Sequence, residues 1–308
     1  MLPTWLLDKP LPAHSGLLNP PKPSGKRLWL LLAQLLISLA LATAGYAAWR
    51  HLYPPISENG WRYETLLDDI EKVSAIALDA EGGLLLSQEL HSGEGRILRY
   101  SADCSLEPVE AGLSKPDGMA SYRGGVLFSQ EQGYAPVLWR TAERTIALFA
   151  GSNVEGLAND GQYLYAIEDR HGDGRLLRYD PSRNTTLVLR SGLDEAEAIA
   201  ACPDGRLFYS QKSNGTVTQL RAEGHDRVTL TGLNQPGFLL CNSEGLWITE
   251  DATHMARVLR LTADGQLHTV LSHLRSPQSL IESRPGHYLL AEQGRNRVLN
   301  LQRTPTGN

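Results

Sequence analysis

The chain repeats one short alternation of apolar runs and polar turns. Residues 155–189 contain four short apolar runs separated by segments rich in Asn, Asp, Gly and Ser. Such residues tolerate the backbone conformations that tight turns require. The second run, residues 163–167, ends in Glu168 and Asp169 and is followed by a Gly-rich loop that contains His171. Four runs of this kind predict an antiparallel sheet of four strands.

The same layout occurs six times along the chain. The copies begin at Ser74, Asp117, Glu155, Glu197, Pro236 and Gln278. An interval of about 40 residues with four strands per copy is typical of a β-propeller, in which each sheet forms one blade. Six copies therefore predict an all-β protein with six blades.

The two ends of the repeat region complement each other. The last copy lacks a fourth strand, and an unassigned strand-like run, residues 61–67, precedes the first copy. We expect this N-terminal strand to pair with the last blade and to close the ring, so that no sheet edge is left open. The predicted propeller spans residues 61–303, with a short C-terminal tail at 304–308.

An uncharged apolar segment, residues 28–48, precedes the propeller. It is long enough to cross a bilayer as a helix. Lys22, Lys26 and Arg27 lie directly before it, and positive charge is retained on the cytoplasmic side of a membrane. We expect a transmembrane signal anchor at 28–49, a linker at 50–60 and a disordered, Pro-rich cytoplasmic tail at 1–27.

This layout predicts a single-pass inner-membrane protein with its propeller in the periplasm. Two alternatives stay open. The propeller would be luminal if the membrane were that of the endoplasmic reticulum. It would be secreted if the small residues at 42–44 formed a signal-peptide cleavage site.

The net charge bears on possible binding partners, and the cysteines bear on the cellular compartment. The net charge is −5 and the isoelectric point is about 6.0, which argues against binding to nucleic acid. Cys202 and Cys241 occupy the same turn position in neighbouring blades, and a disulfide between them would need an oxidising compartment. Equivalent atoms of neighbouring blades are commonly farther apart than the ~5.5 Å that a disulfide favours. The unbonded state is therefore the expectation.

The first strand of each blade lines the channel of a propeller, so the six starting residues should form a ring at one mouth. Three successive members are acids: Asp117, Glu155 and Glu197. Crowded carboxylates repel one another, and a bound cation is the usual way to keep them ionised together. Oxygen ligands favour Ca²⁺, which is the expected ion, with Mg²⁺, Mn²⁺ or Zn²⁺ as alternatives.

The second strands return to the same face and end in polar side chains. The candidate substrate-binding residues are Gln88, Gln130, Glu168, Gln211, Glu250 and Glu292 from these ends, together with His254 and Gln278. The alternative is that such residues cap backbone amides of neighbouring blades. His91 and His171, in the loops that follow two of these strands, are candidates for proton transfer, with an ordinary loop role as the alternative.

Residues 60–303 resemble the six-bladed superfamily of gluconolactonase/regucalcin, paraoxonase and strictosidine synthase-like proteins. Residues 174–192 are similar to the third-blade signature of the strictosidine synthase-like branch. The stretch PDGMA at 116–120 is similar to the metal-ligand motif of the gluconolactonase branch. The resemblance implies that Asp117 is a metal ligand and that Glu155 and Glu197 stand where those enzymes have Asn or another ligand.

Three positions extend or depart from the resemblance. Ser74 stands where gluconolactonases have a ligand Glu. Gln278 stands where strictosidine synthase has its catalytic Glu, so condensation of an amine with an aldehyde is not expected. His91 lies in the loop where paraoxonases carry a catalytic His.

Two functional hypotheses follow. The first is a membrane-anchored, metal-dependent hydrolase of lactones or esters, with the ion on Asp117, Glu155 and Glu197 and a histidine assisting the water. The second is a non-catalytic propeller whose top face binds a small molecule or a protein partner in a membrane complex.

Overall fold

The computed structural model describes residues 25–222 and 224–304, which form two compact units divided between Tyr53 and Pro54. The first unit contains the helix α1 (Gly25–Leu52), which begins and ends three residues beyond the predicted bounds. Residues 25–50 of α1 are long and apolar enough to span a membrane, a property that an N-terminal signal sequence shares. The tail predicted at 1–27 lies outside the described residues up to residue 24, and that at 304–308 lies outside them from residue 305.

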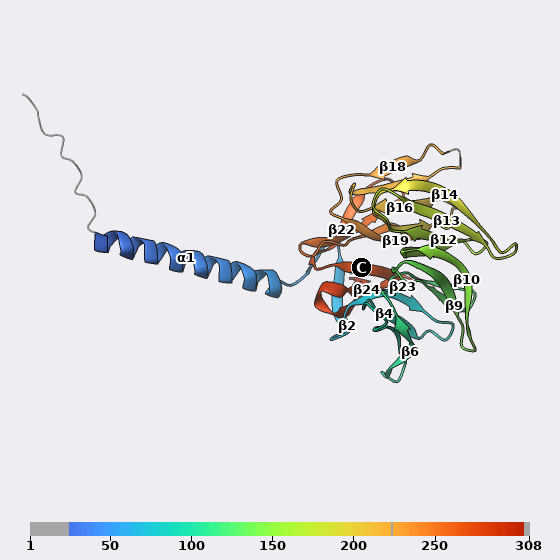
Figure 1. Cartoon of the computed structure of the whole chain (residues 1–308), viewed down its shortest axis with the longest axis horizontal. Coiled ribbons are helices and arrows are strands. Elements are labelled where there is room, and N and C mark those ends of the chain that lie inside the picture. Colours follow the sequence, from blue (N-terminus) through green and yellow to red (C-terminus); the bar gives the residue numbers. More distant parts are fainter. Residues whose placement is uncertain (1–24, 223, 305–308) are drawn as a thin grey trace, which may run out of the picture. The chain divides into compact units, whose positions relative to one another are not determined.

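The second unit is a six-bladed β-propeller, as predicted (Figure 1). The first three blades contain β3 (Val73–Leu78), β4 (Leu84–Gln88), β5 (Gly95–Tyr100) and β6 (Leu106–Leu113); β7 (Met119–Tyr122), β8 (Gly125–Phe128), β9 (Tyr134–Arg140) and β10 (Thr145–Ser152); and β11 (Val154–Asn159), β12 (Leu164–Glu168), β13 (Gly174–Asp180) and β14 (Thr185–Leu193). The last three contain β15 (Ala196–Ala201), β16 (Leu207–Gln211), β17 (Thr216–Leu220) and β18 (Arg227–Leu230); β19 (Pro236–Asn242), β20 (Gly245–Glu250), β21 (Ala256–Leu261) and β22 (Leu267–Leu274); and β23 (Pro277–Arg284), β24 (His287–Glu292), a short 3₁₀ turn, η2 (Gln293–Arg295), and β25 (Arg297–Arg303).

The ring closes through β2 (Trp61–Leu67), which pairs antiparallel with β25 and completes blade 6. The closure predicted from the sequence is therefore confirmed. Trp61 packs edge-on against Trp247 of blade 5 at 5.3 Å and against Tyr288 of blade 6 at 5.7 Å. These contacts give the closing strand a hydrophobic anchor between two blades.

Part of the segment 50–60, which is predicted as a linker, pairs with the propeller. Ile56 and Ser57 form β1 (Ile56–Ser57), which pairs with Ser272 and Leu271 of β22. The physical reason is that β22 is the outer strand of blade 5 and has unpaired backbone groups that a passing segment can satisfy. Blade 5 therefore has a fifth strand.

The hydrophobic core lies between adjacent blades. The inner strands are buried on both faces, so they are nearly continuous apolar runs, as in β12, where every residue is buried. The first residues of the outer strand β14 are exposed instead. One core cluster joins Ile76 and Leu86 of blade 1 to Ala291 and Val298 of blade 6. Each blade therefore depends on its neighbours for burial.

The first strands are irregular where they pass the channel mouth. Pairing with the second strand shifts register between Val73 and Ile76, and equivalent shifts occur in blades 3 to 6. A bulge of this kind bends the strand and redirects a side chain. It directs Ser74 and its equivalents in these blades towards the channel.

Pro236 was predicted as the ring residue of blade 5, and the register corrects this by one position. Pro236 lies opposite Glu250 just as Ala196 lies opposite Gln211, one residue before the ring residue Glu197. The ring position is therefore Gly237. In all six blades the residue two positions before the ring has a left-handed backbone, namely Lys72, Lys115, Asn153, Glu195, Gln235 and Ser276.

The expectation that Cys202 and Cys241 are unbonded was wrong. The two form a disulfide with a Cα–Cα distance of 4.8 Å. Both cysteines belong to the innermost strands or the turns that follow them, where blades that radiate from one axis lie closest together. The general separation of neighbouring blades therefore overestimated this distance. Cys104 is free and exposed.

Candidate metal centre at the channel mouth

The ring residues predicted from the sequence meet at one mouth of the channel. Ser74, Asp117, Glu155, Glu197 and Gln278 line a narrow cavity of about 30 Å³. A volume of this size holds an ion or one or two waters, but not an organic molecule. Any substrate would therefore contact this site from the rim.

The glycines that follow two ring acids permit this crowding. A Cβ atom on Gly118 would lie 2.1 Å from the carbonyl oxygen of Glu155, and one on Gly156 would lie 2.5 Å from that of Glu197. Only glycine allows the backbones of neighbouring blades to approach this closely. The pairs Asp117-Gly118 and Glu155-Gly156 thus bring successive carboxylates together.

The second strand of each blade ends in a three-residue motif, which is Ser87-Gln88-Glu89 in blade 1. The residue at its first position carries a hydroxyl group in four of the blades. The amides of Ala75, Ala198 and Phe238 donate to the hydroxyl oxygens of Ser87, Ser210 and Thr249 at 2.8, 3.0 and 3.1 Å. These are amides of the bulged segments, which lack a regular ladder partner. The hydroxyls therefore stabilise the bulges that direct the ring residues.

The side chain at the second position of the motif forms a hydrogen bond with the backbone of the loop that precedes the same blade. The backbone N–H groups of Ser114, Ser152, Asp194, Asn234 and Arg275 donate to Gln130, Glu168, Gln211, Glu250 and Glu292, and Gln88 donates to the carbonyl of Glu71. Glu168, Glu250 and Glu292 are fully buried and are also paired with Arg175, Arg257 and Arg297. These contacts match the amide-capping alternative, in which the six residues hold backbone groups rather than a substrate.

The third position of the motif reaches the channel mouth. It is occupied by Glu89, Glu131, Asp169, Lys212, Asp251 and Gln293. Their backbone N–H groups donate to the carbonyl oxygens of the six left-handed residues. The substrate-binding residues predicted from the strand ends are those one position earlier, at the second position of the motif. Consecutive side chains of an extended chain point to opposite sides, so only one residue of each pair can face the mouth.

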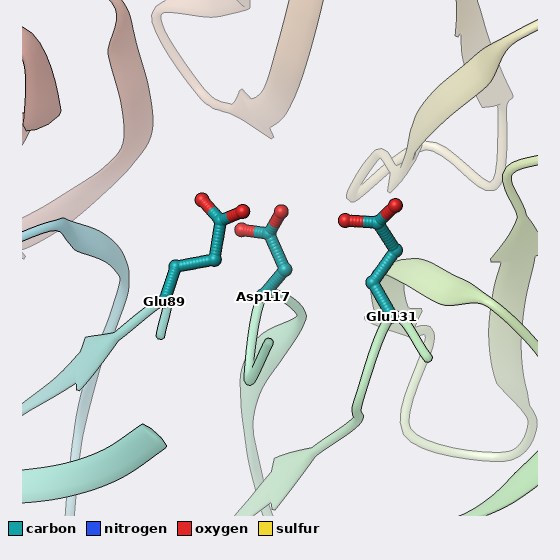
Figure 2. A group of neighbouring side chains, drawn as sticks. All are labelled: Glu89, Asp117 and Glu131. Carbon is teal, nitrogen blue, oxygen red and sulfur yellow. The ribbon is translucent and has the colours of Figure 1, made fainter. Parts of the chain in front are cut away.

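The third-position acids complete two clusters of carboxylates. Glu89, Asp117 and Glu131 form one, in which the three carboxylates project beyond the strand ends next to one another (Figure 2). Glu131, Glu155 and Asp169 form the other, and within each cluster one oxygen per residue lies within 4.8 Å of the others. Glu131 belongs to both clusters.

Two lysines partly neutralise these acids. Lys115 forms an ion pair with Glu131, and its Nζ lies 3.5 Å from Glu89. The Nζ of Lys212 lies 3.1 Å from Glu197 and 2.6 Å from Asp251. Glu197, a predicted metal ligand, is thus paired with a lysine and lies outside both clusters, whereas Asp117 and Glu155 lie inside them.

The remaining acids are short of positive charge. Burial, reinforced by Glu89, raises the pKa of Asp117 well above its usual value, and burial together with Glu197 does the same for Glu155. Burial raises the pKa of Asp169 to about 6, and that of Glu197 to about 7 despite Lys212. A cation at the mouth would favour the ionised forms and lower these pKa values.

The residues fit a divalent cation bound through oxygen. Asp169 Oδ1 is buried and has no hydrogen-bond partner among the described residues. Ca²⁺–oxygen distances are about 2.3–2.6 Å, so oxygens on opposite sides of the ion lie about 5 Å apart. One oxygen from each member of a cluster lies within this distance of the others. The donors are all carboxylate oxygens, which suit Ca²⁺, Mg²⁺ and Mn²⁺ better than Zn²⁺.

The predicted histidines lie apart from this cavity. His91 is exposed in the turn after β4. The His171 side chain is 81 % exposed, and its Nδ1 lies 3.2 Å from Asp194. His254 is partly exposed after β20, and none of the three lines the cavity. Gln278 does line it and donates to Asp251 at 2.7 Å.

No family model and no curated protein matches the sequence. Solved structures do match. A gluconolactonase from Xanthomonas campestris has a TM-score of 0.66 and 14 % identity, covering 82 % of this chain and 96 % of its own. This chain is similar in fold to the gluconolactonase-like six-bladed propellers.

Two further matches name other activities. A streptogramin B lyase has a TM-score of 0.57 and 13 % identity over 80 % of this chain and 100 % of its own. An auxiliary nutrient binding protein from Bacteroides thetaiotaomicron has a TM-score of 0.63 and 14 % identity over 81 % of this chain and 77 % of its own. At these identities the similarity shows the fold alone, and the same fold serves both enzymes and a binding protein.

Replacing Glu250 with Ala should lower the free energy of unfolding by about 2–4 kcal/mol, because the Asn234 amide and Arg257 lose their shared partner. Denaturant titration of the full chain in detergent measures this change. Glu143→Ala, which removes an exposed acid, is the control and should shift the value by less than about 0.5 kcal/mol. An unchanged stability for Glu250→Ala would contradict the structural role.

Proposed function

We propose that this propeller is a divalent-cation-dependent hydrolase of lactones or esters. The observation that carries the proposal is the pair of overlapping carboxylate clusters at the channel mouth. Glu131, Glu155 and Asp169 would hold the ion, with Ca²⁺ as the expected species and Asp117 in the adjoining cluster. When bound, such an ion polarises a carbonyl oxygen and lowers the pKa of a coordinated water.

Glu197 is the best-placed group for moving a proton. Its side chain is buried beside the cavity, and that burial raises its pKa to about 7 when no ion is bound; an ion would favour the ionised form, which can accept a proton. Lys212 holds Oε1 of Glu197 at 3.1 Å and fixes the orientation of the carboxyl group. Proton transfer by His91 or His171, as predicted from the sequence, gains no support from their exposed positions.

The names of two matched structures support an enzymatic function. One is named as a gluconolactonase and another as a lyase, so the fold accommodates catalysis. The volume of the channel cavity implies that the organic part of a substrate lies outside it, on the loops that follow the second strands. The substrate is therefore proposed only as a small lactone or ester.

A second candidate function is a non-catalytic binding platform. The match to a nutrient binding protein favours it, as do the two lysines that already neutralise part of the acidic ring. In this role the top face would bind a small molecule or a protein partner in a membrane complex.

Measuring Ca²⁺ binding by variants shows which acids are ligands of the ion. The double variant Glu155→Gln/Asp169→Asn should lose Ca²⁺ binding in calorimetry of the full chain, because two of the three oxygen ligands of one cluster lose their charge. The control Glu143→Gln changes the charge of an exposed acid and should bind as the wild type does. Any metal-dependent turnover of lactones or esters should be lost with ion binding.

The hydrolase proposal is wrong if the wild-type protein binds no Ca²⁺, Mn²⁺ or Zn²⁺ and no member of a lactone and ester panel is turned over. A stoichiometric partner that still co-purifies with the Glu155→Ala/Glu197→Ala variant would support the binding platform instead.

We also propose that α1 is an uncleaved anchor and that the propeller lies on the periplasmic side of the inner membrane. Lys26 and Arg27 precede the uncharged part of α1, in agreement with the positive-inside rule. The Cys202–Cys241 disulfide supports an oxidising compartment. Release by cleavage and a luminal propeller remain the alternatives.

A membrane-impermeant maleimide tests this location on intact cells. Cys104 is exposed and free, so it should be labelled, whereas Cys202 and Cys241 should be labelled only after reduction. Cys104→Ser should abolish labelling of the unreduced protein. Labelling that occurs only after cell lysis would place the propeller in the cytoplasm, and a labelled protein in the medium would indicate cleavage.

A further inference from the structure

Lys115 sits between two blades and contacts two acids of the first cluster. Its ammonium is paired with Glu131 of blade 2 and lies 3.5 Å from Glu89 of blade 1. The Lys115 N–H donates to the carbonyl of Leu90 at 2.7 Å, and its own carbonyl accepts from the Glu131 N–H at 2.8 Å. The side chain is 21 % exposed. Both backbone and ammonium are therefore fixed at the mouth.

The two carboxylate clusters differ in this respect. The cluster Glu89–Asp117–Glu131 has an ammonium next to two of its three members. In the part of the chain that the structure describes, no basic nitrogen lies within 4.0 Å of Glu155 or Asp169. Asp169 Oδ1 is also buried and unpartnered. The ammonium thus contacts two of the three members of the first cluster, but only the shared Glu131 in the second.

Lys212 bounds the second cluster on its other side. Its ammonium contacts Glu197 of blade 4 and Asp251 of blade 5 at 3.1 and 2.6 Å. This contact withdraws Glu197 from the set of free oxygen ligands. The two acids of the second cluster that neither lysine contacts, Glu155 and Asp169, both belong to blade 3.

We propose that Lys115 is a built-in counter-cation, which excludes a divalent ion from Glu89–Asp117–Glu131 and restricts the mouth to one ion at Glu131–Glu155–Asp169. The inference rests on the ion site of the proposed function and adds its stoichiometry. Glu131 belongs to both clusters, and a carboxylate shared in this way is the arrangement that places two metal ions about 3.5–4 Å apart. An ammonium at the first cluster repels a divalent ion there by the same Coulomb law that would attract it to the acids.

Calorimetric titration of the full chain in detergent with Ca²⁺ tests the inference. The wild-type protein should bind one ion. Lys115→Gln should bind two ions per chain, because the first cluster then has three carboxylates and no ammonium. Lys115→Met preserves most of the side-chain length and should behave in the same way, which provides a second neutral variant if one of them does not fold.

Three further variants test whether the position of the positive charge, and not only its loss, sets the number of bound ions. Lys72→Gln removes one positive charge from an exposed side chain two residues before Ser74, the ring position of blade 1, and should still bind one ion. Lys115→Arg retains the charge at the first cluster and should also bind one ion. In Lys115→Gln/Glu89→Gln the first cluster loses a ligand, so the stoichiometry should return to one.

The outcomes separate the two proposals. One ion in the wild type and one in Lys115→Gln, with an unchanged affinity, would overturn the role of Lys115 and leave the ion site intact. No ion in any variant would overturn the ion site itself. Two ions in the wild type, seen also as Mn²⁺–Mn²⁺ coupling by electron paramagnetic resonance, would contradict the inference without any variant.

Discussion

Mutual repulsion of carboxylates is the constraint on which the account of this propeller depends. Acids from five blades converge at one end of a channel that holds little more than an ion. At close range and partly out of water, such groups favour protonation or a nearby cation. The structure supplies part of the required charge through Lys115 and Lys212. The remainder is uncompensated around Glu155 and Asp169, which is why an ion site is the most direct explanation of the cluster.

The rest of each blade holds that arrangement in place. In five blades a bulge in the first strand directs one side chain inwards, and in three of these a hydroxyl accepts from the amide that the bulge leaves unpaired. In all six blades the next residue holds the preceding loop. The same three positions recur around the ring with different charges at the last one. The scaffold is therefore shared by all blades, whereas the chemistry at the mouth varies from blade to blade. This division is consistent with a fold that serves a gluconolactonase, a lyase and a binding protein.

Much of the fold was predictable because its signal is repeated. The six copies of the repeat predicted six blades. The missing last strand indicated the closure by residues 61–67, and the structure confirms both. Details that depend on a single residue were harder to predict. Pro236 was placed one position away from the true ring residue, Gly237, because glycine has no side chain to mark the ring. The disulfide was missed because the distance between innermost strands differs from the average distance between blades.

The site was predicted only in part for a similar reason. Asp117 and Glu155 were found because each begins a copy of the repeat, directly before its first apolar run. Glu89, Glu131 and Asp169 were passed over in favour of their neighbours, since the side to which a strand end points depends on local geometry. The pairing of Glu197 with Lys212 brings together residues from two strands of one blade, and the spacing of the repeat carries no information about it.

The location of a bound ion tests the central claim most directly. Crystals of the full chain soaked in Mn²⁺ and measured with anomalous scattering would show it. The account predicts one peak per chain, in contact with oxygens of Glu131, Glu155 and Asp169, with Lys115 still paired to Glu131. A mouth without any peak, or an ion bound elsewhere on the propeller, would contradict it.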